Sequence, residues 1–319
     1  MMLAPMEDVT DTAFRELVLR LSDKKHLNLL FTEFTSTDGM CHPVGKDKVS
    51  YRLKISEDER RLLKEKDVKI IAQIWGNNPE KFRQTADYIT NNYDFDGLDL
   101  NFGCPMKNIV SHGSCAALIN QNSLVNEIIH ATKEGTNLPV SVKTRLGIKE
   151  ISTEKWFSFL LTQPIDAITV HGRIQKQMSD GIANWDEIKK VTDIRNSLGS
   201  SIKIIGNGDV ESIEESHKKS EKYGVDGVMI GRGIFKNPWL FSPELKEITI
   251  EERIKTLSLH LDLFEKNWGT TRNFPILRRF FKIYLSEFRY AADFRHDMMS
   301  VNNYEEARKT ITEWKLKLL

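Results

Sequence analysis

Short runs rich in valine and isoleucine recur along roughly the first 240 residues, and a helical pattern separates each run from the next. The runs are nearly continuous apolar stretches, as is typical of strands that are buried on both faces of a parallel sheet. The candidate strands are Leu3–Met6, Leu29–Glu33, Ile70–Ile74, Gly97–Asn101, Val140–Thr144, Ala167–Val170, Lys203–Ile205 and Gly227–Ile230. Strands that alternate with helices eight times in this way predict a (β/α)₈ TIM barrel.

The helices expected between these strands carry ordinary start signals. They are Asp11–Leu21, Pro79–Asn91, Ser123–Lys133, Thr153–Leu161, Trp185–Asn196 and Ser212–Tyr223. Pro79 stands at a helix start, where its missing N–H group costs least. A doubly wound open sheet is the alternative, but that fold usually carries a GxGxxG turn after its first strand, whereas EDVTD follows here.

The chain changes character after Ile230. The dipeptide Asn237-Pro238 breaks the pattern, and from Ile250 onward only helical periodicity remains. Three helices are expected there, at Glu251–Lys266, Pro275–Phe288 and Tyr304–Lys317. We therefore expect a barrel domain over residues 1–243 and a helical domain over residues 244–319, joined by a short linker and held in fixed contact.

The net charge of +1 is uninformative, but its distribution is not. Residues 246–319 hold 14 Lys and Arg against 11 Asp and Glu, and the stretch Arg272–Arg295 interleaves six basic residues with aromatic ones. A basic and aromatic face is typical of nucleic-acid binding. Taken alone, the stretch fits better a helix that buries an aromatic stripe and leaves its basic face to solvent.

Composition excludes several classes of protein. Three cysteines without a CxxC pair argue against a disulfide framework, a zinc ribbon and a thioredoxin-type motif, and they favour a reducing compartment. Cys41 lies beside His42, but without a second Cys/His pair we expect no metal site. No window approaches a membrane span and the N-terminus does not resemble a signal peptide, so we expect a cytoplasmic protein with no membrane contact.

Polar residues crowd the ends of the predicted strands. They fall at Ala4–Met6, Gln73, Asn101–Pro105, Lys143–Arg145, His171–Arg173, Gly206–Asp209 and Gly231–Gly233. A (β/α)₈ barrel places its active site at the C-terminal ends of its strands, so this collective pattern predicts a catalytic site. Glycine-bearing turns after the last two strands commonly hold a phosphate through backbone N–H groups, and Arg232 adds a positive charge there.

Three of these residues suggest chemistry directly. The ammonium of Lys143 can stabilise a negative charge that develops during reaction, although a barrel-mouth salt bridge is the alternative. Cys104, held in the rigid turn NFGCP, can act as proton donor or nucleophile rather than as a buried apolar residue. His171 could bind an oxygen or serve only a structural role. We interpret Cys115, which opens a helical stretch, as a packing residue or at most a loop-lining one.

Taken together, the motifs resemble the flavin-dependent tRNA-dihydrouridine synthase family. The matching segments cover nearly the whole chain in the family's order: LAPMEDVTDTAFR, QIWGNNPEKF, DGLDLNFGCPMKNIV, VSVKTRLG, ITVHGRIQKQ, IIGNGDV, GVMIGRGIFKNPWLF and the basic helical C-terminus. The combination is highly specific, although several segments alone are not. The resemblance implies an FMN-binding TIM barrel with a C-terminal helical domain that binds tRNA.

The resemblance also implies an activity and a set of residues. The enzyme would use NADPH to reduce the C5–C6 double bond of a uridine in the tRNA D-loop, with hydride from the flavin N5 to C6 and a proton from Cys104 to C5. Expected FMN contacts are Pro5, Met6, Gln73, Lys143, His171, Asn207, Gly208, Asp209, Gly231 and Arg232. Expected substrate contacts are Asn101, then Arg145 and Arg173, two arginines that we place at the barrel rim, and Arg278, Arg279 and Lys282 of the helical domain.

The sequence departs from the family pattern at two positions, and two other functions are alternatives. Ile174-Gln175 stand where the family often shows Thr-Arg, and Cys115 stands where many members have glycine or alanine. A small-molecule FMN oxidoreductase of the dihydroorotate dehydrogenase type would share the barrel but needs no basic helical domain. An RNA-binding protein that has lost catalysis would not need Cys104 and Lys143. We expect a monomer.

Overall fold

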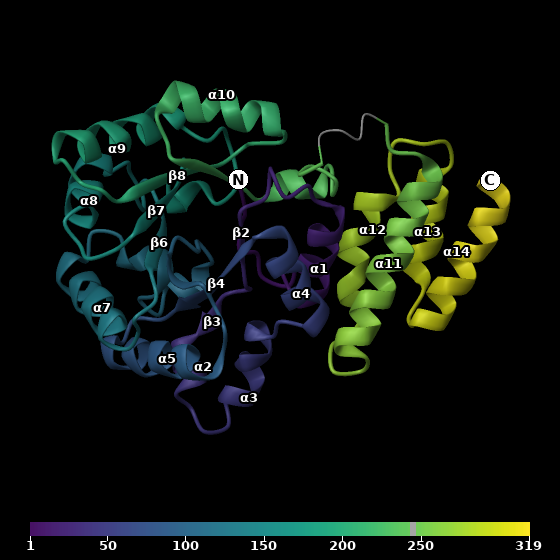
Figure 1. Ribbon diagram of the computed structural model, residues 1–319, viewed down its shortest axis with the longest axis horizontal. Coiled ribbons are helices and arrows are strands. Elements are labelled where there is room, and N and C mark those ends of the chain that lie inside the picture. Colours follow the sequence, from purple (N-terminus) through teal and green to yellow (C-terminus); the bar gives the residue numbers. More distant parts are fainter. Residues whose placement is uncertain (243–246) are drawn as a thin grey trace.

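The protein, described by a computed structural model over residues 1–242 and 247–319, is built around a closed parallel barrel (Figure 1). Within these residues the strands are β1 (Met2–Leu3), β2 (Leu29–Phe31), β3 (Thr35–Ser36), β4 (Lys69–Trp75), β5 (Gly97–Phe102), β6 (Val140–Arg145), β7 (Ala167–His171), β8 (Lys203–Asn207) and β9 (Gly227–Ile230). Strand β1 pairs with both β9 and β2, and β2 pairs with β4, so the ring closes. The predicted (β/α)₈ barrel is confirmed.

Strands β2 and β3 occupy one position in the ring, because both pair with β4. The sequence predicted a single strand over Leu29–Glu33, and the structure ends it earlier. The hydroxyl of Thr32 accepts a hydrogen bond from the backbone N–H of Gln73 at 3.1 Å, so a side chain replaces a backbone acceptor in the ladder. This interruption separates β2 from β3.

Helices surround the barrel, and several of them begin at a residue whose side chain caps the first turn. They are α1 (Thr12–Leu21), α2 (Thr37–Met40), α3 (Lys46–Val49), α4 (Glu57–Lys66), α5 (Pro79–Asn92), α6 (Lys107–Val110), α7 (Asn122–Glu134), α8 (Thr153–Leu160), α9 (Trp185–Ser197) and α10 (Ile213–Tyr223). Asp11 caps α1 by accepting from the N–H of Phe14, and Asn78 caps α5 in front of Pro79. Helices α2, α3, α4 and α6 were not predicted.

A bundle of four further helices packs against one side of the barrel (Figure 1). It comprises α11 (Ile250–Trp268), α12 (Arg278–Tyr284), α13 (Ala291–Ser300) and α14 (Tyr304–Leu318). The ring of Phe14 in α1 lies 5.0 Å from that of Phe280 in α12, and the indole of Trp268 donates to the capping carboxylate of Asp11 at 2.9 Å. The bundle is thus joined to the barrel by apolar and polar contacts, as the short linker predicted.

One helix prediction in this bundle is wrong. A single helix was expected over Pro275–Phe288, but the chain forms a 3₁₀ turn and then α12, which ends at Tyr284. Leu285 leaves the helical region with φ −97° and ψ 69°, and Glu287 follows with a positive φ. Arg253 pairs with Glu287, and Arg295 donates to the carbonyl of Leu285 at 2.6 Å. These tertiary contacts end the helix, and the unpredicted α13 follows.

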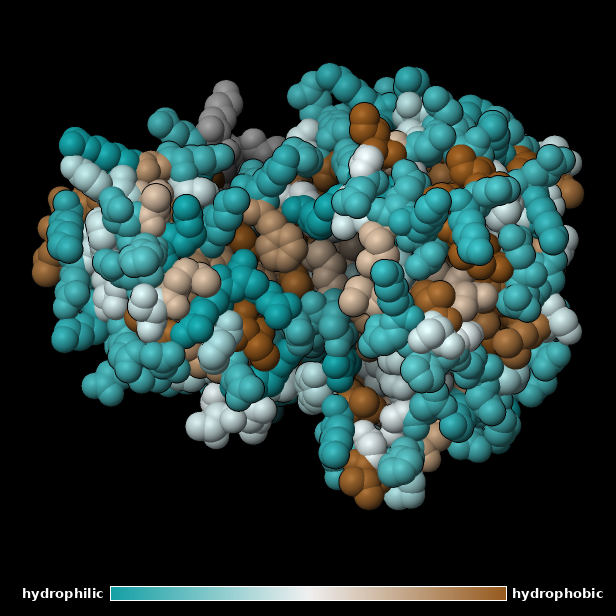
Figure 2. Space-filling model, turned by 180° about the vertical axis from the view of Figure 1, so that it is seen from behind, coloured by the Kyte–Doolittle hydropathy of each residue, from teal (hydrophilic) through white to brown (hydrophobic). Residues whose placement is uncertain are grey.

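The predicted boundary between residues 243 and 244 lies outside the described residues. In the part of the chain that is described, no helix combines the length and the apolar character that a bilayer span requires. Seen from behind, much of the surface is hydrophilic, and apolar side chains reach it in a hollowed strip between the bundle and the barrel (Figure 2).

Candidate active site

The C-terminal ends of neighbouring strands bring the predicted polar residues together. Strand pairing aligns Asn101 with Lys143, and His171 with Asn207. The Lys143 ammonium donates to the side-chain oxygen of Asn207 at 3.2 Å, and the Asn207 amide in turn donates to the carbonyl of Met229 at 2.8 Å. The barrel therefore places an ammonium and oriented amides in one group at its mouth.

A chain of hydrogen bonds runs from Asp99 to the turn that carries Cys104. Gln73 donates to the Asp99 carboxylate at 2.6 Å and accepts from the Asn101 amide at 3.0 Å. The Asn101 oxygen then accepts from the backbone N–H groups of Gly103 at 3.0 Å and Cys104 at 2.9 Å. Because a carboxylate only accepts, it fixes the direction of both amides. Asp99 thereby orients the turn that presents the thiol.

The charged groups at the mouth titrate far from their ordinary values. Burial and, to a smaller extent, the nearby guanidinium of Arg145 lower the pKa of Lys143 to about 8, against the opposite effects of Asp99 and Cys104. Burial raises the pKa of Asp99 to about 6. Burial, together with the positive charge of Lys143 and the nearby arginines, holds the pKa of His171 well below its ordinary value, so its ring is neutral at physiological pH.

Cys104 is only partly buried, and its surroundings favour the thiolate. A hydrogen bond from the thiol of Cys115 lowers the pKa of Cys104 to about 7, helped by the N–H of Met106 and the charge of Arg145. Burial and the carboxylate of Glu7 act in the opposite direction. A group with a pKa near neutrality is well matched to proton transfer. Cys115 was interpreted from sequence as a packing residue or at most a loop-lining one. It is fully buried, as packing predicts, and its thiol also influences the candidate proton donor.

The turns after β8 and β9 have the shape that a phosphate site needs. Gly208 adopts φ +129°, and a Cβ there would lie 2.6 Å from the Cβ of Ala183, so only glycine fits. At Gly231 an added Cβ would meet only Ala4, at 3.7 Å, and a 3₁₀ turn begins directly after it. The side chain of Arg232 is exposed beside these turns. Open backbone beside an exposed guanidinium, which lies 3.6 Å from the Asp209 carboxylate, fits the phosphate of a mononucleotide.

Two arginines do not project to the rim as predicted, because both are buried. Arg145 donates to the carbonyls of Gly103 at 2.7 Å and Met178 at 2.7 Å. Arg173 pairs with the carboxylate of Asp209 at 2.7 Å. Carbonyls at the ends of the mouth loops need donors, and these guanidinium groups supply them. Arg145 still lies close enough to influence the pKa of Cys104, whereas Asp209 uses its carboxylate to hold Arg173 and the N–H of Ala183.

Pro5 and Met6 lie directly after β1 and are partly buried. The carbonyl of Met6 accepts from the N–H groups of Val9 and Thr10, and its own N–H donates to the Thr10 hydroxyl at 3.0 Å. This loop is therefore fixed beside the other strand ends, where the sequence placed it.

A second, basic pocket lies on the helical bundle. It is lined by Arg278, Lys282, Ala292, Arg295, His296 and Met299 of α12 and α13. Arg278 and Lys282 were predicted to act together, and the pocket joins them with four residues that were not among the predicted substrate contacts, of which Arg295 and His296 are basic. Arg279, the third predicted residue, instead donates to the backbone carbonyl of Asp8 at 3.2 Å and pairs with its carboxylate at 3.3 Å.

Between bundle and barrel, Arg272 meets three carboxylates from the start of the chain. It pairs with Asp8 and Asp11, each at 3.0 Å, and with Glu33 at 3.2 Å. Burial raises the pKa of Glu33 to about 7 despite the opposing charge of Arg272. From the sequence, Arg272 was assigned to the basic stretch and Glu33 to the end of a strand, since no local pattern connects residues so far apart.

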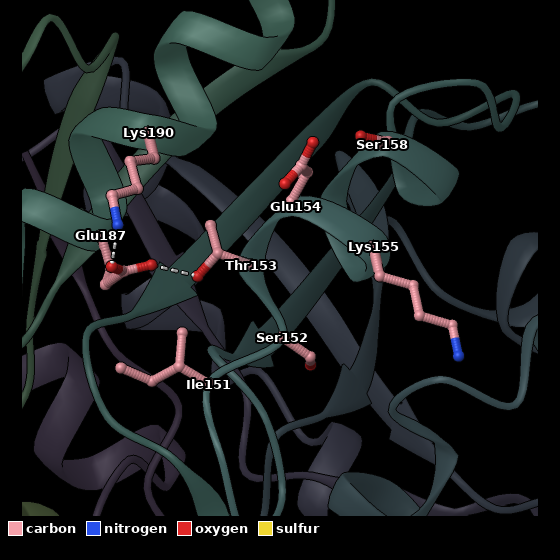
Figure 3. A pocket seen from close by; sticks show the side chains of 8 residues that line it. All are labelled: Ile151, Ser152, Thr153, Glu154, Lys155, Ser158, Glu187 and Lys190. Atoms are coloured by element: carbon pink, nitrogen blue, oxygen red, sulfur yellow. Dashed lines mark hydrogen bonds and ion pairs between the residues drawn. The ribbon is translucent and has the colours of Figure 1, made fainter.

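A third pocket lies where α8 and α9 begin, outside the group of strand-end residues (Figure 3). Three of its polar side chains bond one another, because Glu187 accepts from Thr153 at 2.5 Å and from Lys190. Lys155 points away from this pair (Figure 3). We assign no chemistry to this pocket.

Comparison with known proteins agrees with this geometry. A family model described as Dihydrouridine synthase (Dus) matches residues 2–318. A probable tRNA-dihydrouridine synthase from Staphylococcus aureus (strain COL) is 42% identical over 318 residues, covering 99% of this chain and 93% of the relative. A probable tRNA-dihydrouridine synthase 2 from Bacillus subtilis (strain 168) is 40% identical over 319 residues, covering 99% of this chain and 94% of the relative.

Solved structures with the same barrel are more distant in sequence. A mutant of morphinone reductase in complex with tetrahydroNAD has a TM-score of 0.51 at 11% identity, covering 76% of this chain and 85% of that chain. The old yellow enzyme homologue from Zymomonas mobilis has a TM-score of 0.50 at 11% identity, covering 79% and 91%. At such low identity, these likenesses show that the fold is shared.

Proposed function

The chain belongs to the dihydrouridine synthase family, and from that premise we propose that it is an FMN-dependent enzyme that uses NADPH to reduce a uridine of tRNA to dihydrouridine. The observation that carries this proposal is the meeting, at one barrel mouth, of a thiol poised for proton transfer, an ammonium and an open glycine-rich phosphate cradle. The small-molecule alternative is not favoured, because full-length relatives are named as tRNA enzymes.

The residues present fit a flavin mononucleotide. The turns at Gly208 and Gly231, with Arg232, would hold its phosphate, while Gln73, Lys143 and Asn207 would face its ring. When bound, the flavin supplies the hydride that reduces the base. Lys143 lies where its ammonium stabilises negative charge that develops on the ring, and a pKa near 8 keeps it mostly protonated at neutral pH.

Cys104 then completes the reduction. Adding hydride to C6 of an uncharged double bond leaves C5 in need of a proton, and the Cys104 thiol delivers it. Asn101 holds the thiol's turn through two backbone N–H groups, so the proton is presented from a fixed position. The target base must leave its stack to reach the barrel mouth, which costs a few kcal/mol. Contacts with RNA phosphates elsewhere on the enzyme would offset that cost.

Reoxidation of the bound flavin tests the proposal. The purified protein is reduced with NADPH without oxygen and mixed with an unmodified tRNA transcript, while the visible flavin absorbance is followed. We expect the oxidised spectrum to return with tRNA but not with orotate or free uridine. A flavin that ignores tRNA and reacts with orotate would establish the small-molecule function instead.

Replacing Lys143 with methionine is expected to weaken flavin binding or slow its reduction. Methionine keeps the volume of the side chain while removing the charge that would face the flavin ring. Flavin content of the purified variant and its rate of reduction by NADPH give the measurement. Lys149→Met, an exposed position in the following loop, is the control. A Lys143 variant that stays yellow and fully active would remove this residue from the flavin site.

We further propose that residues 244–319 bind tRNA, with the basic pocket of α12 and α13 on a phosphate. Lys282 and His296 are exposed at this pocket, and Arg278 and Arg295 line it while bracing nearby carbonyls. This surface belongs to the same rigid bundle that Arg272 and Trp268 hold against the barrel. RNA bound there would be oriented relative to the barrel mouth. The monomeric state and the cytoplasmic location remain predictions.

The double substitution Arg278→Gln and Lys282→Gln is expected to weaken tRNA binding. Each phosphate contact that is lost should flatten the dependence of log Kd on log salt concentration by about one unit. Binding is measured by filter retention across a salt series, with Lys309→Gln on α14 as the control. Unchanged affinity and salt dependence would show that the pocket is a solvated surface that does not bind tRNA.

A further inference from the structure

A second thiol touches the candidate proton donor. Cys115 opens the 3₁₀ turn Cys115–Leu118 and is fully buried, and its thiol lies close enough to lower the pKa of Cys104. The backbones of the two turns are tied together as well, because the N–H of Ala116 donates to the carbonyl of Cys104 at 3.3 Å. The two sulfurs therefore meet through fixed turns rather than through mobile loops.

The backbone at Cys115 shows that this position is unusual for a side chain. Its φ is +55°, in the left-handed region that favours glycine. A cysteine there accepts backbone strain that a glycine would avoid. The strained turn nevertheless directs a thiol at Cys104, so the pair is not accounted for by packing alone.

The two thiols differ in exposure and in charge. Cys104 is partly exposed, and Arg145, Met106 and Cys115 all favour its thiolate. Burial and the neighbouring sulfur of Cys104 raise the pKa of Cys115 well above its usual value, so Cys115 stays protonated. An accessible thiolate beside a buried thiol is the arrangement typical of a cysteine that is oxidised first and a partner that resolves the product.

We propose that Cys104 and Cys115 form a reversible disulfide when the enzyme meets a peroxide. The Cys104 thiolate attacks one peroxide oxygen, the O–O bond breaks, and hydroxide leaves to become water, so Cys104 is oxidised to a sulfenic acid. The sulfur of Cys115 then attacks the sulfenic sulfur, the S–O bond breaks, and the Cys115 proton leaves with the hydroxyl as water. Overall, two thiols and one hydrogen peroxide give one disulfide and two waters.

The disulfide would have two consequences. It shields Cys104 from irreversible oxidation to sulfinic acid, and it removes the proton that reduction of uridine requires. The first consequence depends only on the thiol pair, whereas the second rests on the proposed function. A dithiol reductant reverses both, because thiol–disulfide exchange regenerates the two thiols.

Peptide mapping of the purified full-length enzyme tests the disulfide. The protein is treated with hydrogen peroxide, free thiols are blocked, and non-reducing digests are analysed by mass spectrometry. We expect a Cys104–Cys115 crosslink, loss of tRNA reduction, and recovery of activity after dithiothreitol. Cys41→Ala is the matched control, since Cys41 lies against Lys81 and Thr85 of α5, and it should behave like the wild type.

Cys115→Gly separates the disulfide from a structural role. Glycine suits the left-handed backbone, so this variant should fold and retain flavin, and Cys115→Ser provides a second test. In both variants, peroxide should oxidise Cys104 to sulfinic acid, and dithiothreitol should restore at most about a tenth of the activity that it restores in the wild type.

The outcomes distinguish this inference from the proposed function. If the wild type forms no Cys104–Cys115 crosslink, or if wild type and Cys115→Gly lose and regain activity alike, the thiol switch is wrong. If the crosslink forms but tRNA reduction continues unchanged, the switch chemistry stands and the role of Cys104 as proton donor is wrong.

Discussion

Replacing Cys104 with alanine is expected to slow dihydrouridine formation by about 10²–10⁴-fold, the range typical for loss of a general acid. The flavin should remain bound, because Gln73, Lys143 and the glycine turns do not depend on the thiol. Single-turnover reoxidation of the reduced flavin by tRNA measures the effect. Cys41→Ala should leave the rate unchanged. Full activity of the Cys104 variant would remove this residue from the mechanism.

The pH dependence of the wild type gives an independent check on the same residue. Only the protonated thiol can deliver a proton, and the pKa of Cys104 lies at about 7. The rate of the chemical step should therefore be highest below pH 7 and fall as the pH rises through that value. Cys115→Gly removes the hydrogen bond that contributes most to the low pKa, so the fall should move to higher pH. A profile that does not move would show that Cys115 has no influence on the titration.

Local patterns in the sequence predicted the barrel and most strand-end residues. The apolar runs at β4 to β9 are long and regular enough to identify buried strands, and the parallel register then carries Asn101 beside Lys143 and His171 beside Asn207. Once a barrel is assumed, residues at strand ends must meet, whatever their separation along the chain. This explains why the central site could be predicted from the sequence.

Contacts set by tertiary structure could not be predicted in this way. The contact between Cys115 and Cys104 depends on a positive φ and on one backbone hydrogen bond between two turns. The early end of α12 depends on Arg253 and Arg295, which lie on other helices. Arg145 and Arg173 turn inward because loop carbonyls need donors, and no periodicity in the sequence signals that need.

The largest group of contacts that the sequence did not predict is the cluster of Arg272 with Asp8, Asp11 and Glu33. Replacing Arg272 with methionine is expected to destabilise the protein by about 3–5 kcal/mol at pH 8. The Arg272 side chain is only 7% exposed, and the side chains of Glu33 and Asp11, which it neutralises, are 0% and 5% exposed. Removing the guanidinium leaves these carboxylates buried without a counter-charge. Urea unfolding measures the loss. Arg279→Met is the matched control, because its side chain is 40% exposed and surface pairs contribute about 1 kcal/mol or less.

The destabilisation by Arg272→Met should depend on pH in a defined direction. In the folded protein, burial raises the pKa of Glu33 to about 7 and raises that of Asp11, while Arg272 opposes both shifts. Removing Arg272 raises these folded-state pKa values further, so the variant loses stability relative to the wild type as the pH rises through about 7, where Glu33 ionises in the folded wild type but stays protonated in the folded variant. The deficit should be largest at pH 8 and shrink toward pH 5, where protonation leaves less buried charge to neutralise. Arg272 also stacks 5.2 Å from the rings of Tyr51 and Trp268, so a deficit that is equal at both pH values would mean that it acts through packing rather than charge.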